Sequence, residues 1–126
     1  MAALVFDSGA LIALERGDRA VGALLAAAAR DGIDAVTSST CVAQVWREPA
    51  RQARLARSLA GFLERPLDAT DARRAGTLMA RTETCDVVDA AVATLASEGD
   101  TILTSDPHDI ARLLDGLGTR ALVRPV

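Results

Sequence analysis

Three aspartates stand at positions where a carboxylate is either energetically costly or needed for function. Asp7 directly follows the apolar run of residues 4–6, and Asp106 closely follows the β-rich run of residues 101–104. Asp89 lies among valines and alanines, where a buried charge is costly unless it has a partner or a ligand. Asp86 stands three residues earlier, and helical i, i+3 spacing would put both carboxylates on one face. The sequence therefore predicts a group of convergent acids.

Convergent carboxylates predict a hard divalent cation. Oxygen-only ligands favour Mg²⁺ or Mn²⁺ over zinc. The chain contains one histidine, His108, and two distant cysteines, Cys41 and Cys85, so a thiolate and imidazole zinc site would lack ligands. An ion such as Mg²⁺ lowers the pKa of a bound water and neutralises charge on a phosphoryl oxygen. The acids thus predict metal-dependent hydrolysis of a phosphodiester.

Each acid also has a simpler structural interpretation. Asp86 and Asp106 stand at positions typical of helix N-caps, and Asp7 competes with Ser8 to cap the first helix. Asp89 resists this interpretation, because it lies inside a helical segment with apolar neighbours. The joint pattern of acids favours the metal more than any single acid does.

The acids depend on alternating strands and helices to bring them together. Strands are predicted at residues 4–6, 35–37, 101–104 and 121–123, and helices at residues 10–14, 18–32, 41–47, 49–61, 68–81, 86–97 and 107–114. This alternation predicts an α/β fold, a three-layer α/β/α sandwich around a mostly parallel sheet. In such a sheet the functional crevice lies outside the carboxyl ends of the strands, where Asp7 and Asp106 are expected. No linker or repeat interrupts the pattern, so one domain is expected over residues 1–126.

Composition excludes several classes of protein. The 126 residues carry 17 acids against 14 cations, a net charge of −3 that argues against a generally basic nucleic-acid coat. All the cations are arginine, and the lack of lysine excludes P-loop, Schiff-base and receiver-type phosphoacceptor chemistry. Aromatic residues make up 2%, too few for a base-stacking platform. With no basic leader and no long uncharged run, a cytoplasmic protein without a membrane span is expected.

Three acidic segments resemble the motifs of PIN-domain ribonucleases, and most closely those of the VapC type of toxin. They are residues 4–13, residues 86–93 with D-V-V-D-A, and residues 103–110 with T-S-D-P. The resemblance covers essentially the whole chain, in the family's order. It implies a PIN-like fold, cleavage of RNA with Mg²⁺ or Mn²⁺, and a homodimer. It also implies inhibition by an antitoxin protein that inserts a peptide into the active-site groove.

The resemblance assigns roles to particular residues. Asp7, Asp89 and Asp106 match the family's first, third and fourth acids, as catalytic residues and metal ligands. Asp86 matches an auxiliary acid on the helix and is predicted as a further metal ligand. The residues predicted to contact the substrate are Ser8, Gln44, Arg47, Arg51 and Ser105.

One position departs from the family pattern. The second acid is usually a glutamate in the sequence A-E-[LV], and here Gln44 stands at that position. A glutamine cannot ionise or act as a base. Glu48, one turn later, is predicted to substitute as a catalytic acid. The alternatives are weaker metal binding, or a catalytically inactive PIN-like module that still binds a partner protein or RNA.

The densest basic segment contains Arg47, Arg51, Arg54 and Arg57. From Arg51 onward, spacing of three residues would align the guanidinium groups along one side of a helix. Such a stripe is suited to grip a phosphate backbone. The alternative is a solvated helix face that pairs with local acids.

Overall fold

A five-stranded parallel sheet forms the centre of the protein. The computed structural model describes residues 2–126. The sheet has the order β3-β2-β1-β4-β5, and every neighbouring pair is parallel. Its strands are β1 (Leu4–Phe6), β2 (Ala35–Ser38), β3 (Leu63–Arg65), β4 (Thr101–Thr104) and β5 (Leu122–Pro125). The three central strands are almost entirely buried, as expected for parallel strands covered on both faces.

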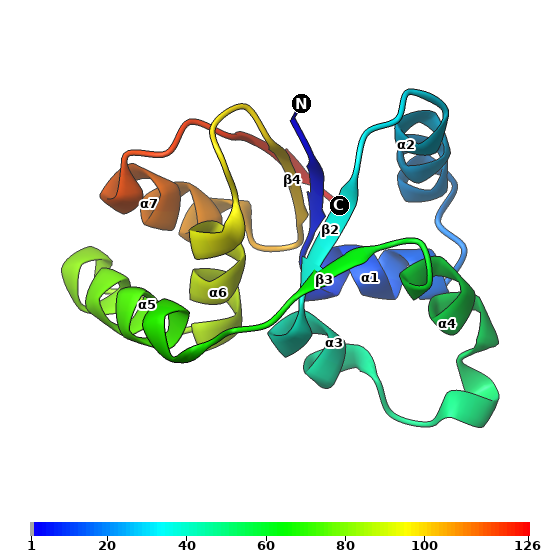
Figure 1. Ribbon diagram of the computed structural model, residues 1–126, viewed down its shortest axis with the longest axis horizontal. Coiled ribbons are helices and arrows are strands. Elements are labelled where there is room, and N and C mark those ends of the chain that lie inside the picture. Colours follow the sequence, from blue (N-terminus) through cyan, green and yellow to red (C-terminus); the bar gives the residue numbers. More distant parts are fainter. Residues whose placement is uncertain (1) are drawn as a thin grey trace.

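Helices cover both faces of this sheet. They are α1 (Ser8–Glu15), α2 (Arg19–Arg30), α3 (Ser39–Val45), the 3₁₀ turn η1 (Pro49–Arg51), α4 (Ala53–Leu59), α5 (Ala69–Thr82), α6 (Val87–Leu95) and α7 (Pro107–Leu117). In Figure 1, α5, α6 and α7 lie on one side of the sheet, and α1, α2 and α4 lie on the other. The predicted three-layer α/β/α sandwich is therefore confirmed. Within residues 2–126, no helix combines the length and apolar character that a membrane span needs.

The core contains few aromatic residues, so aliphatic side chains fill most of it. Phe6 and Phe62 form one edge-to-face pair with ring centroids 4.8 Å apart. Leu11 and Leu55 are fully buried on the α1 and α4 side of the sheet, and Leu113 is fully buried on α7. A core of this kind holds the sheet between two helical layers with a single pair of aromatic rings among the described residues.

Aspartate side chains begin several of the helices. The Asp7 carboxylate accepts a hydrogen bond from the Ala10 N–H at 2.9 Å, and Asp86 accepts one from the Asp89 N–H at 3.0 Å. Asp7, rather than Ser8, is therefore the cap of α1. Asp106 occupies the N-cap position of α7, but its side chain makes no capping hydrogen bond. The structural interpretation holds for Asp7 and Asp86, and it leaves the Asp106 carboxylate free for another role.

The single helix predicted over residues 49–61 is wrong, because the chain breaks at Gln52 into η1 and α4. The buried Gln52 amide oxygen accepts hydrogen bonds from the N–H groups of Arg47 at 2.8 Å and Glu48 at 3.0 Å. Its amide nitrogen donates to the Val45 carbonyl at 2.9 Å. One side chain thus satisfies three backbone groups at the end of α3 and in the turn that follows it.

The edge strand β3 was not predicted. Its residues Leu63, Glu64 and Arg65 are all exposed, so the segment shows no alternation of buried and exposed side chains. It joins the sheet through parallel pairing with β2. Backbone pairing, which leaves little trace in the sequence of an edge strand, defines this element.

A close approach between α1 and the β4–α7 turn requires glycine at position 9. A Cβ atom on Gly9 would overlap both the Oγ and the Cβ atoms of Ser105. In the same place the Ser105 N–H donates to the Asp7 carboxylate at 3.1 Å. The missing side chain lets the segments after β1 and β4 lie against each other.

Gly9→Ala is expected to destabilise the fold by about 1–3 kcal/mol, because the new methyl group overpacks this contact. Ser105→Gly in the same chain removes both overlapping atoms and is expected to restore most of the stability. Urea unfolding measures both effects. Gly76→Ala is the matched control, since no atom lies within 4 Å of a Cβ there and the change favours the α5 helix. A Gly9→Ala chain as stable as the Gly76→Ala chain would contradict this account.

Candidate metal centre

The carboxyl ends of β1 and β4 meet at the point where the strand order reverses. From β1 the chain continues to β2 on one side, while β4 pairs with β1 on the other side. The Asp7 N–H donates to the Leu103 carbonyl at 3.1 Å, which fixes Asp7 beside the end of β4. Open parallel sheets bind their ligands at such a reversal. Asp7 and Asp106 therefore lie where the sequence predicted them.

Asp7 is held by its backbone surroundings. The residue is only 3% exposed, and its carboxylate accepts hydrogen bonds from the N–H groups of Ala10 and Ser105. Burial raises the pKa of Asp7, while hydrogen bonds from the Thr104 side chain and these N–H groups act in the opposite direction. The donors orient the side chain and leave it the remaining lone pairs of its oxygens.

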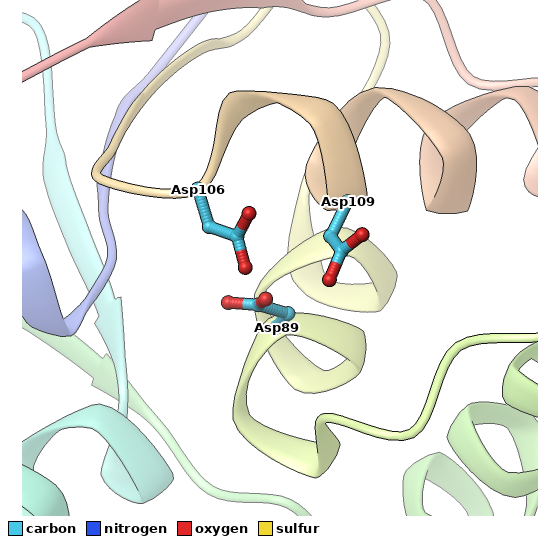
Figure 2. A group of neighbouring side chains, drawn as sticks. All are labelled: Asp89, Asp106 and Asp109. Carbon is cyan, nitrogen blue, oxygen red and sulfur yellow. The ribbon is translucent and has the colours of Figure 1, made fainter.

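Three carboxylates from two helices share one space. Figure 2 shows Asp89 on α6 facing Asp106 and Asp109 at the start of α7. One oxygen from each of the three lies within 4.8 Å of the others. Asp109 was missed at the sequence level, although it stands three residues after Asp106 and so on the same side of the helix. That spacing was the signal that could have found it.

Asp89 carries the least favourable charge in the group. It is 7% exposed, and its Oδ2 atom is buried without a hydrogen-bond partner in the described chain. Its pKa is raised to about 8, first by burial, then by the Asp106 side chain, and then by the charges of Asp86, Asp106 and Asp7. A bound cation would satisfy the orphaned oxygen and offset the repulsion. Three carboxylate donors with no sulfur or imidazole fit Mg²⁺ or Mn²⁺.

Three further predicted residues lie near this group: Asp86, Ser8 and Ser105. Asp86 is exposed and caps α6, so it acts on Asp89 through its charge. Ser8 follows Asp7, and its buried hydroxyl oxygen has no partner within residues 2–126. Ser105 is exposed and holds Asp7 through its backbone N–H.

Gln44 is exposed on α3, one turn beyond Cys41. Cys41 is buried beside Asp7 and Ser8, and burial, followed by the Asp7 charge, raises the pKa of its thiol. Because i, i+3 positions share a helix side, Gln44 lies on the same side of α3 as Cys41, but its own side chain is exposed.

Glu48 and the predicted arginines stand apart from the three-carboxylate group. Glu48 is exposed and pairs with Arg51 at 3.3 Å. The Arg47 guanidinium donates to the carbonyls of Ala43 and Trp46 at 3.0 and 2.8 Å. The predicted arginine stripe is not one helix face, because the chain breaks at Gln52 between Arg51 and α4.

Fold and site together define an α/β sandwich with an acidic centre at the reversal of its parallel sheet. No protein-family model matches the sequence, and no curated protein matches it. A solved structure with the same fold is the crystal structure of VapBC2 from Rickettsia felis bound to a DNA fragment from their promoter. One of its chains is 11% identical, with a TM-score of 0.71 over 98% of each chain. At this identity the likeness shows a shared fold, and it confirms the PIN-like architecture that the sequence predicted.

Asp89→Asn is expected to stabilise the metal-free protein at alkaline pH. The folded-state pKa of Asp89, about 8, lies above its ordinary value of 3.8, so the folded chain holds this proton more tightly than the unfolded chain. The resulting stability is complete below pH 3.8 and is lost as the pH rises through about 8. The asparagine variant carries no charge to bury. At pH 9 in EDTA its melting temperature should exceed that of the parent by roughly 3–8 °C.

The control for this experiment is Asp115→Asn, an exposed acid on the same chain. It should follow the parent from pH 5 to pH 9. If Asp89→Asn lost as much melting temperature as the parent over that range, Asp89 would not carry a buried charge.

Proposed function

We propose that this protein is a Mg²⁺- or Mn²⁺-dependent endoribonuclease that hydrolyses RNA phosphodiester bonds, and that it is the toxin of a type II toxin-antitoxin pair. The observation that carries the proposal is the group formed by Asp89, Asp106 and Asp109, whose oxygens lie within 4.8 Å of one another. It stands beside Asp7 at the strand-order reversal, with one buried carboxylate oxygen unsatisfied.

Each residue has a role in this proposal. Asp89, Asp106 and Asp109 would hold the ion, and Asp7, whose carboxylate is oriented by two backbone N–H groups, would be a further ligand. The bound ion supplies charge neutralisation at the phosphoryl oxygens and a lowered pKa for a water. Asp86 adds negative charge at the rim of the site.

Two serine hydroxyl groups would contact the substrate beside the acids. The Ser8 hydroxyl oxygen is buried and has no partner among the described residues, so the side chain would have to turn outward to reach a phosphate. Ser105 is exposed in the turn between β4 and α7. Both can donate to a phosphate oxygen, which carboxylates cannot do.

The proposal includes protein partners. A structure of the same fold is that of a VapBC2 complex, which supports a cognate antitoxin for this chain. Exposed apolar side chains at the β5 end, Leu122 at 64% and Val126 at 44%, offer surface for an antitoxin or for a second copy in a homodimer. The proposal includes a cytoplasmic location for this chain.

A second candidate function is a PIN-like module that binds RNA or a partner protein without cleaving it. The observation that favours it is Gln44, which supplies no charge at the family's usual glutamate position. Glu48, which was predicted to compensate, pairs with Arg51.

Cleavage of RNA in Mn²⁺ tests the proposed function. Asp7→Asn and Asp89→Asn are each expected to lower the rate about 100-fold or more, because replacement even of residues that only support metal ligands costs 10–100-fold. Asp115→Asn should retain the parent rate. A gel assay with a labelled single-stranded RNA measures all four proteins. A parent chain that binds RNA but cleaves none, with or without Mn²⁺, would favour the binding module.

Gln44→Glu tests the departure from the family pattern. An added carboxylate at the position of the family's usual glutamate should tighten Mn²⁺ binding about tenfold, as measured by titration calorimetry. Ala43→Glu is the matched control, since it adds the same charge one position away on an exposed part of α3. Equal affinities for the two variants would show that position 44 does not face the ion.

A further inference from the structure

A groove lined with arginine runs along α5, outside the acidic group. It has a volume of about 400 Å³ and lies between α5 and the last residue of α7, Leu117. Its polar lining is entirely cationic or hydroxyl, with no carboxylate: Thr70, Arg73, Arg74, Thr77 and Arg81. The chain as a whole has a net charge of −3, so the positive charge of this groove is a local feature.

The spacing of these residues places them on one face of α5. Relative to Thr70 they stand at i+3, i+4, i+7 and i+11, the pattern of a continuous helical face. At 1.5 Å per residue the stripe is about 16 Å long. Arg73, Arg74 and Arg81 are all exposed, so their guanidinium groups are open to a ligand.

Neutral carbonyl groups hold two of these guanidinium groups in place. Arg73 donates to the Ala69 carbonyl at 3.0 Å, and Arg81 donates to the Gly116 carbonyl at 2.5 Å. The acid paired with Arg74 is Asp71, at 3.8 Å. A carbonyl orients a guanidinium without cancelling its charge and leaves most of its five N–H donors for another acceptor.

A further arginine connects this groove to the acidic group. Arg112 stands one turn after Asp109 on α7, and its guanidinium donates to the Thr82 carbonyl at 2.6 Å. Thr82 ends α5, next to Arg81. Figure 1 shows α5 and α7 on the same side of the sheet. The cations therefore begin one helical turn from the acidic group and continue along α5.

We propose that Arg112, Arg81, Arg74 and Arg73 form a track for the phosphates of a single RNA strand whose scissile bond lies at the acidic group. The proposal rests on the proposed ribonuclease function and adds where the strand runs. Guanidinium groups bind phosphate with paired hydrogen bonds, and the threonine hydroxyls beside them are further donors. No aromatic side chain lines the groove, so the contact is with the backbone and not with stacked bases.

The variant that tests this track is R73Q/R74Q. Neither guanidinium bonds to α7, so the packing of the two helices is preserved. The matched control is R19Q/R30Q, which removes the same charge from α2 on the other side of the sheet. Binding is measured by fluorescence anisotropy with a labelled polyuridine of about 20 nucleotides, which is longer than the track. The buffer contains EDTA so that no cleavage occurs.

R73Q/R74Q is expected to bind this RNA about tenfold more weakly than the control variant at moderate salt. The slope of log affinity against log salt should fall in magnitude by about 1.4, or about 0.7 for each lost phosphate contact. In Mn²⁺, kcat/KM should fall for the long oligonucleotide and stay at the parent value for a tetranucleotide too short to reach α5.

Three results would overturn the track. The first is a parent chain that does not bind the RNA in EDTA. The second is equal affinities and equal salt slopes for R73Q/R74Q and R19Q/R30Q. The third is an R73Q/R74Q chain that loses binding of polyglutamate but binds the RNA as tightly as the parent. The last result would assign the groove to an acidic protein segment. Binding in EDTA does not require catalysis, so failure of the proposed nuclease function is distinguishable from failure of the track.

Discussion

Repulsion among carboxylates held at one edge of a sheet is the constraint around which this structure is arranged. The chain fixes Asp7 with two backbone N–H donors and a buried strand end, and it places Asp89 inside a helix with one oxygen unsatisfied. Asp106 stands at a helix start but gives its carboxylate no capping bond. Together these features keep acids close together that would separate in a flexible chain. The energetic cost is local, and a cation is the simplest group that removes it.

The parallel sheet places the acidic residues at one edge, and close packing between the segments after the strands brings these residues near one another. Since the strand order reverses at β1 and β4, the segments that follow these strands diverge to opposite faces and leave a crevice between them. Gly9 then lets α1 approach the turn that carries Ser105 and Asp106. The core behind this edge is mostly aliphatic, with one pair of phenylalanine rings, and its side chains are largely buried, so the acids rest on a rigid support.

The sequence predicted those features that depend on local pattern. The ends of the buried strands, and with them Asp7 and Asp106, follow from short apolar runs, and Asp89 follows from its apolar neighbours. The edge strand β3 could not be predicted because its residues are exposed on both faces. The break at Gln52 depends on the burial of a polar side chain, which no local sequence pattern indicates. In the sequence Asp109 resembles an ordinary surface acid of a helix, and only the structure shows that it faces Asp89 on α6. The arginine groove on α5 likewise needs α7 to form its second wall.

The capping arrangement of the acids has an electrostatic consequence beyond single hydrogen bonds. Asp7 precedes α1, Asp89 lies in the first turn of α6, and Asp106 precedes α7, so the positive ends of three helix dipoles converge on the acidic group. Their field offsets part of the repulsion among the acids without any bound ion. The same field would act on the phosphate of an approaching strand.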